Sequence, residues 1–193
     1  MRYFIELSYN GKKYHGWQIQ PDAISVQEKL NKALSIIFQN EIAVVGAGRT
    51  DTGVHASQIF AHFDIEKELK GDVVFKLNSI LPHDITIYNV SLVENEKHAR
   101  FDALSRSYEY RIWLGRNPFL LDFSWQIHSQ DLDIKKMNEA AKLLLEFENF
   151  QAFSKVKTEV YTFNCDVTEA VWIQQGNLLI FHITANRFLR NMV

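Results

Sequence analysis

The sequence is poor in cysteine, in long apolar runs and in net charge. Cys165 is the single cysteine among 193 residues, which excludes a disulfide framework and a zinc site built on thiolates. No apolar run approaches the roughly 18 residues of a membrane span. Because Met1 leads directly into a strand pattern, we expect no signal peptide, no membrane partner and a cytoplasmic location. We also expect no metal, since His55 and His62 lack the spacing of a helical metal pair.

The charge and size of the chain restrict its function only weakly. The formal net charge is −2 and the isoelectric point is about 6.4. This balance argues mildly against an RNA partner, because nucleic-acid-binding proteins often carry an excess of basic residues. A protein of neutral net charge can still carry a basic cleft. With 47% hydrophobic residues the chain can bury a good core, as one large domain or two small ones.

Glycine, which is scarce overall, is concentrated between residues 46 and 55, in the segment Gly-Ala-Gly-Arg-Thr-Asp-Thr-Gly-Val-His. Glycines let a ligand or another part of the backbone approach closely. Asp51 lies within this loop, and the positive charge of Arg49 can keep a nearby acid ionised. An ionised, positioned carboxylate can act as a nucleophile. The alternative is that Asp51 only caps a turn, as residues in Gly/Asp/Thr clusters often do.

The remainder of the chain alternates between strand and helix patterns. Alternating or short apolar runs predict strands over residues 2–9, 42–45, 58–65, 85–93, 105–114, 164–172 and 178–184. Apolar stripes predict helices over residues 26–38, 72–81 and 133–147, the first preceded by a capping box that begins at Ser25. Asn186 is expected to cap one more helix. The order predicts an α+β fold in two similar halves, residues 1–104 and 105–193, facing each other across a cleft.

Two pairs of aromatic residues have more than one interpretation. Tyr14 and Trp17 follow a lysine-containing turn, where exposed rings can stack on RNA bases. Alternatively, they anchor the loop to the core. Tyr108 and Tyr110 lie on one face of an alternating strand, where packing in the core is the default for both.

Several ordered segments of the chain resemble the TruA-type tRNA pseudouridine synthases. The signature loop of that family is similar to Gly48–Ala56. Further resemblance runs along the chain, in segments 14–18, 25–30, 78–84, 98–101, 106–110 and 186–193. The number of matches in order makes coincidence a poor explanation, and it favours a catalytic role for Asp51 over a turn cap.

The resemblance implies a fold, a reaction and a set of site residues. It implies two related α+β halves around a central antiparallel sheet, a basic cleft between them, and a homodimer. The reaction it implies is isomerisation of uridine to pseudouridine in the anticodon arm of tRNA, at positions 38 to 40, without a cofactor. Asp51 matches the catalytic aspartate, Arg49 the neighbour that holds the flipped nucleotide, and Tyr108 the tyrosine that stacks against the target base. Weaker candidates for RNA contact are Arg106, Arg187, Arg190, Tyr14 and Trp17.

The last motif departs from the family pattern. In the family this motif continues with an arginine that pairs with the catalytic aspartate, and Val193 lies one residue before that position. Arg190 belongs to the same motif but is not that arginine. We therefore expect a C-terminal half that is incomplete at its end.

Two other functions compete with the synthase. One is a non-catalytic module that binds structured RNA through its backbone and shape. The other is a soluble hydrolase in which Asp51 works with Asp102 or Glu109 as an acid and base pair. The set of Arg49, Asp51 and Tyr108 favours the synthase, because a pure binder gains little from an acid near phosphates. Whether Asp51 attacks C1′, attacks C6 or removes a proton from the sugar stays open.

Overall fold

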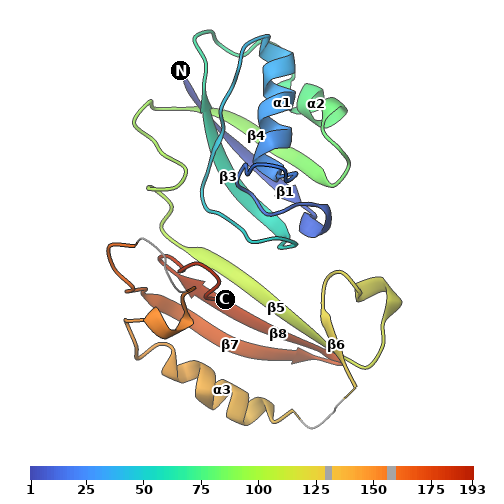
Figure 1. Ribbon diagram of the computed structural model, residues 1–193, viewed down its shortest axis with the longest axis vertical. Helices are drawn as coiled ribbons and strands as arrows, with labels where there is room; N and C mark the ends of the chain where they lie inside the picture. The colour runs from blue at the N-terminus through green and yellow to red at the C-terminus, as the bar shows by residue number, and fades with distance from the viewer. Residues whose placement is uncertain (129–131, 156–159) are drawn as a thin grey trace. The chain divides into compact units, whose positions relative to one another are not determined.

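The chain folds into two compact units, each built around its own sheet. The computed structural model describes residues 1–128, 132–155 and 160–193. The N-terminal unit is Met1–Ala103 and the C-terminal unit is Leu104–Val193. Each combines a four-stranded, mainly antiparallel sheet with helices (Figure 1), which confirms the predicted α+β class. Within the described residues, no helix combines the length and the apolar character needed to cross a membrane.

The sheet of the N-terminal unit is antiparallel and has the order β2-β3-β1-β4. Its strands are β1 (Arg2–Tyr9), β2 (Val45–Gly46), β3 (Ala56–Asp64) and β4 (Ile85–Val93). Every second residue of β1, from Tyr3 to Tyr9, is buried, as expected for a strand with one face on the core. Because β1 lies between β3 and β4, its C-terminal end is held on both sides.

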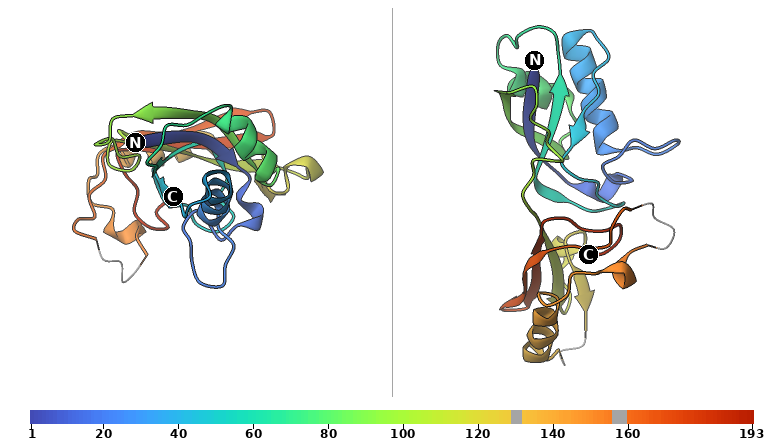
Figure 2. Two further views of the ribbon diagram at one scale, coloured as in Figure 1. Left: turned by 90° about the horizontal axis from the view of Figure 1, so that it is seen from above. Right: turned by 90° about the vertical axis from the view of Figure 1, so that its left-hand side faces the viewer.

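Two helices, α1 (Val26–Phe38) and α2 (Val73–Ile80), cover the buried face of this sheet (Figures 1 and 2). Leu30 of α1 and Leu77 of α2 are fully buried in the same cluster as the inward residues of β1. The Ser25 side chain accepts a hydrogen bond of 3.2 Å from the amide of Glu28, so α1 begins where the capping box predicts. This core therefore fixes the end of β1 and the start of α1, and the chain between them is held at both ends.

The chain between α1 and β2 differs from the prediction. Residues 42–45 were expected to form a strand, but the strand occupies only Val45–Gly46. The amides of Ile42 and Val44 instead donate to side chains of α1, at 3.0 Å from Ser35 Oγ and 3.0 Å from Asn31 Oδ1. Because these amides bond to a helix, they are not available for a strand ladder. Ile42 and Val44 are nevertheless buried, as their apolar pattern indicates.

The C-terminal unit has a sheet of order β6-β5-β8-β7, in which β5 and β6 are parallel and the other pairs antiparallel. Its elements are β5 (Arg106–Leu114), η2 (Pro118–Leu120), β6 (Trp125–Ile127), α3 (Ile134–Leu143), η3 (Gln151–Phe153), β7 (Val167–Gln175) and β8 (Leu178–Ala185). The helix α3 lies along β7 (Figure 1), where Asn138 exchanges two hydrogen bonds with the backbone of Trp172.

Two predictions for the C-terminal unit are wrong. The helix predicted over residues 133–147 ends at Leu143, because the amides of the next three residues donate three positions back and tighten the chain into a turn. Asn186 does not cap a helix. Its side chain accepts from the amide of Asp166 at 2.9 Å, so it joins the chain before β7 to the end of β8.

Buried His62 of β3 holds the segment that follows β4. The amide of Ala99 donates to His62 Nδ1 at 3.2 Å, and the His98 ring lies edge-on at 4.6 Å between ring centroids. Arg2, paired with Asp64, donates to the carbonyl of Lys97 at 2.9 Å. Burial lowers the pKa of His62, and the positive charge of Arg2 lowers it further.

We predict that acid weakens the fold through His62. Its folded pKa is below the ordinary value of 6.5, so the unfolded chain takes up the proton first as pH falls. The free energy of unfolding should therefore decrease as pH drops through about 6.5 and continue to decrease until the folded pKa is reached. His62→Asn keeps an acceptor near Nδ1 and removes the titration. Urea unfolding at about pH 7.5 and pH 5.5 should show a smaller decrease for the variant, and an equal decrease would contradict the prediction.

Candidate active site

The glycine-rich segment, residues 46–55, begins with the last residue of β2 and runs as a loop to the start of β3, and we term it the Asp51 loop. At its start, the amide of Ala47 donates to the carbonyl of Phe60 at 2.7 Å. Near its end, the amide of Val54 donates to the Asp51 carbonyl at 3.3 Å. Gly53 between them has a φ of +79°, a left-handed conformation that other residues rarely adopt. Backbone hydrogen bonds and the conformation of Gly53 therefore define the turn that carries Asp51.

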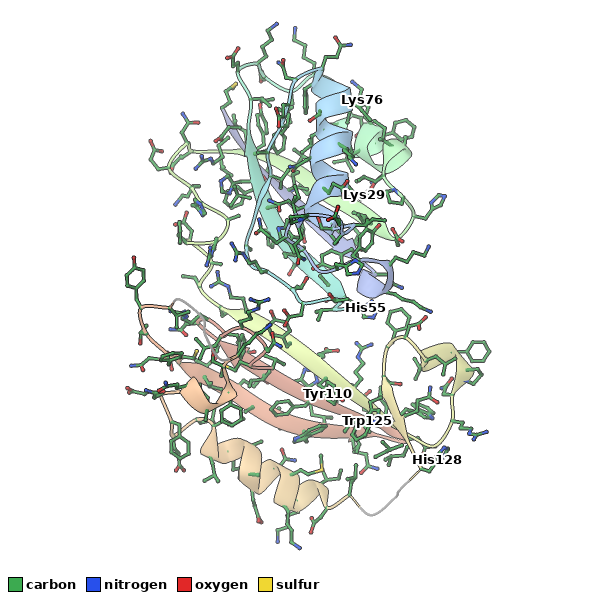
Figure 3. All side chains as sticks on the ribbon, viewed as in Figure 1. Lys29, His55, Lys76, Tyr110, Trp125 and His128 are labelled. Carbon is green, nitrogen blue, oxygen red and sulfur yellow. The ribbon has the colours of Figure 1, made fainter. Side chains whose placement is uncertain are left out.

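Segment 9–17, which begins with the last residue of β1, binds the Asp51 loop. Hydrogen bonds join Tyr9 Oη to Thr50 Oγ1 (2.8 Å), the Gly11 amide to His55 Nδ1 (3.1 Å), the Gly53 amide to the Tyr14 carbonyl (3.2 Å) and the Trp17 amide to the Thr50 carbonyl (3.3 Å). His55 directly precedes β3, beside the short 3-10 helix η1 (Gly11–Lys13) (Figure 3). Contacts on both sides of Asp51 thus tie its loop to the core of the N-terminal unit.

Two glycines of segment 9–17 make this contact sterically feasible. A Cβ on Gly11 would lie 1.9 Å from the Val54 carbonyl oxygen, and a Cβ on Gly16 would lie 2.1 Å from that of Thr50. Gly16 also has a φ of +83°. Both positions therefore require glycine because the two backbones touch there.

Tyr14 and Trp17 are not the exposed rings that the RNA-stacking interpretation requires. Their exposed fractions are 3% and 1%. The Trp17 ring lies against the backbone of Gly46, where a Cβ would come within 2.4 Å of it. The Tyr14 hydroxyl donates to Asp84 Oδ1 at 2.5 Å. These contacts fit the alternative interpretation, in which both rings anchor the loop to the core.

Asp51 and Arg49 are exposed on this anchored loop. Arg49 Nε donates to Gln18 Oε1 at 3.0 Å. Across the N-terminal unit, which is described in full, no hydrogen bond or ion pair engages the Asp51 carboxylate. The arrangement therefore presents a carboxylate and a guanidinium to solvent from a loop whose backbone is bonded on both sides.

The remaining sequence-predicted site residues lie on the C-terminal unit. Tyr108 is half-buried on β5, and its ring meets Phe188 edge-on with 5.2 Å between centroids. Arg106 Nη1 donates to the Asn186 carbonyl at 2.8 Å. The structure thus brings the start of β5 next to residues 186–190, where Arg187 is half-buried and Arg190 exposed. Tyr110, expected in the core like Tyr108, is 45% exposed (Figure 3).

The carboxylates considered as partners for Asp51 have local roles. Asp102 Oδ2 accepts from the amide of His98 at 2.8 Å. Glu109 pairs with Arg111 and lies 3.7 Å from His182 Nδ1. Within the described part of the chain, no group of three or more His, Cys, Asp or Glu residues is arranged to hold a metal ion.

Sequence reasoning missed three residues that support the Asp51 loop. Tyr9 bonds to Thr50, Gln18 bonds to Arg49, and Asp84 bonds to Tyr14. Gln18 and Asp84 are the last residues of two segments on which the family resemblance rests. That position is the one feature of the sequence that pointed to them. Their partners lie 31 and 70 residues away, so the sequence pattern does not identify the contacts.

Comparison with known proteins gives a consistent set of relatives. tRNA pseudouridine synthase A of Parabacteroides distasonis is 48% identical over 195 residues, which cover 100% of this chain and 77% of the relative. The protein of the same name from Bacteroides fragilis is 50% identical with the same coverage. That of Chlorobaculum tepidum is 39% identical over 98% of this chain and 77% of its own length. No family model matches the chain.

We predict that Gly16→Ala destabilises the N-terminal unit by about 1–3 kcal/mol, because it adds a strained φ and a clash with Thr50. Gly48→Ala is the matched control. A Cβ at Gly48 meets no atom within 4 Å, and its φ is not positive. Urea unfolding should place Gly48→Ala within about 0.5 kcal/mol of the parent. Equal stability of the two variants would contradict the proposed backbone contact.

Proposed function

The chain belongs to the tRNA pseudouridine synthase A family, and we propose that it isomerises uridine to pseudouridine in tRNA. We propose further that the target lies in the anticodon stem-loop, at positions 38 to 40, and that the Asp51 carboxylate is the essential catalytic group. The observation that carries this proposal is Asp51 itself, exposed on a loop whose backbone is bonded to the core on both sides.

The reaction exchanges one bond of the nucleotide for another. The bond between N1 of uracil and C1′ of ribose breaks, the base turns, and a bond forms between C5 and C1′. C5 loses its proton and N1 gains one, so substrate and product are isomers and no co-substrate is consumed. The catalyst must stabilise positive charge on the sugar, or bond to it, while the detached base stays enclosed. A carboxylate can serve either purpose.

The surroundings of Asp51 suit this role. No protein group in the N-terminal unit engages its carboxylate, so the oxygens are free to meet a nucleotide. The loop backbone is held by segment 9–17, so little conformational freedom is lost when the nucleotide binds. Asp102 and Glu109 are engaged elsewhere, which disfavours a hydrolase built on two carboxylates.

Arg49 and Tyr108 have proposed roles in holding the nucleotide. A paired uridine must be flipped out of its stack, at a cost of a few kcal/mol. Arg49 carries its charge on the same loop as Asp51 and can contact the phosphate or the vacated space. Tyr108 can stack on the base from β5, and the exposed or half-buried Arg106, Arg187 and Arg190 can contact the RNA backbone. A homodimer and a cytoplasmic location are part of the same proposal.

We predict that the protein releases tritium into water from tRNA carrying 5-tritiated uridine, because bond formation at C5 expels that hydrogen as a proton. Asp51→Asn should reduce release by at least about 10³-fold, since the amide cannot act as a nucleophile or stabilise the cation. The tRNA dissociation constant should change by less than about threefold, as the Asp51 side chain makes no hydrogen bond that orders the loop. Both quantities should be measured on this chain and on a version extended beyond Val193 with the final segment of a relative.

Substrates with a single uridine among the three positions identify which nucleotide reacts. Substrates that keep uridine at only one of positions 38, 39 and 40 should release tritium, whereas a substrate with none of the three should not. Binding of tRNA without release by the extended parent protein would favour the non-catalytic RNA-binding module. Release that survives Asp51→Asn would contradict the role of the carboxylate.

A further inference from the structure

Asp84 connects the chain between α2 and β4 to the segment that binds the Asp51 loop. Its carbonyl accepts from the Asn10 amide at 2.8 Å, and its Oδ1 accepts from the Tyr14 hydroxyl at 2.5 Å. Lys13 Nζ lies 3.7 Å from Oδ2. The Asp84 side chain is 20% exposed, whereas Tyr14 is 3% exposed. One residue thus holds both ends of the turn η1.

Tyr14 carries this connection to the catalytic loop. Its hydroxyl bonds to Asp84, and its carbonyl accepts from the amide of Gly53, two residues after Asp51. The buried ring packs with the core of the unit, so the residue cannot move at one end without moving at the other. Burial, and then the hydrogen bond to Asp84 and its negative charge, raise the pKa of Tyr14 above its ordinary value. The phenol therefore remains a hydrogen-bond donor at neutral pH.

We propose that Asp84 is a positioning residue for catalysis, which acts through Tyr14 to fix the turn that carries Asp51. This inference rests on the function proposed above. A hydrogen bond to a charged acceptor is among the stronger ones in proteins. Its loss leaves a buried hydroxyl without its partner, which costs free energy unless the ring or the segment moves. Movement of Tyr14 displaces the Gly53 amide and, with it, the carboxylate of Asp51.

The main test compares Asp84→Ala and Tyr14→Phe with the parent in single-turnover tritium release. Each variant should release tritium about 10- to 100-fold more slowly, because a small displacement of a catalytic group has effects of that size. The tRNA dissociation constant should stay within about twofold, since Tyr14 is buried and the Asp84 side chain, which is 20% exposed, is engaged by Tyr14. The double variant should be no slower than the slower single variant, because both remove the same interaction.

Conservative and structural controls separate positioning from general destabilisation. Asp84→Asn keeps an oxygen that accepts from Tyr14 and should recover most of the rate. Asn78→Ala removes two hydrogen bonds of 2.8 Å between α2 and Ile87 of β4, on the same helix–strand connection, and neither of them involves Asp84 or Tyr14. It should lower the melting temperature at least as much as Asp84→Ala does and leave the release rate within about twofold of the parent.

Cleavage by trypsin after Arg49 gives a readout that does not depend on activity. Arg49 lies within the Asp51 loop, so its cleavage rate reports how often the loop opens. Well below the melting temperature, Asp84→Ala and Tyr14→Phe should be cleaved there about tenfold faster than the parent. Asn78→Ala should be cleaved at the parent rate.

The two readouts distinguish failure of this inference from failure of the proposed function. Parental release and parental cleavage rates in Asp84→Ala would overturn the inference and leave the function intact. Equal loss of rate in Asn78→Ala and Asp84→Ala would also overturn it, since the effect would then follow stability. If the parent releases no tritium, the proposed function is wrong, and the rate of cleavage after Arg49 is then the one test of whether Asp84 positions the loop. Faster cleavage in Asp84→Ala would then support positioning, and unchanged cleavage would overturn it.

Discussion

The close approach of two backbones, segment 9–17 against the Asp51 loop, is the contact on which the site depends. Gly11 and Gly16 bring segment 9–17 so near to the Asp51 loop that a Cβ at either glycine would overlap a carbonyl oxygen. The oxygen is that of Val54 for Gly11 and that of Thr50 for Gly16. Hydrogen bonds of Tyr9 and Trp17 with Thr50, and of the Gly53 amide with the Tyr14 carbonyl, then connect loop and segment on both sides of Asp51. Each of these residues is buried in the core of the N-terminal unit. The position of the carboxylate is thus set by the packing of that core.

This arrangement explains how an exposed acid can be a positioned one. In the proposed reaction the oxygens of Asp51 stay free for a nucleotide, so its own side chain cannot supply the interactions that hold it. The backbone on either side does so instead, and the aromatic residues that support it are out of reach of RNA. The two charged side chains of the loop do not pair with each other. Arg49 instead donates a hydrogen bond to the neutral side chain of Gln18. Among the residues that the structure describes, no carboxylate pairs with the Arg49 guanidinium, so its charge is available to a phosphate.

The sequence predicted the class of fold and the loop that carries Asp51, and it failed where long-range contacts decide. Period-two and helical patterns located β1, α1 and α2 because those elements bury one face. The strand predicted over residues 42–45 was misplaced because its amides bond to side chains of α1, which no local pattern reveals. Tyr14 and Trp17 had two interpretations, since lysines beside them suggest a surface while the glycine that receives the indole is 29 residues away. Asp84 had no signal beyond its place in a segment that resembles the family, because its role depends on Tyr14, which lies 70 residues earlier in the chain.

Hydrogen exchange of the loop amides tests most directly whether the N-terminal unit itself builds the site. The amides of Gly53 and Trp17 are the informative ones, because each donates across the contact between loop and segment. In the protein without tRNA, both should exchange at least about 100-fold more slowly than in an unstructured chain. Addition of tRNA should change those rates little, since the loop already has its bound conformation. Exchange at the rate of an unstructured chain, slowed only when tRNA binds, would show that the nucleic acid orders the loop and would contradict the account.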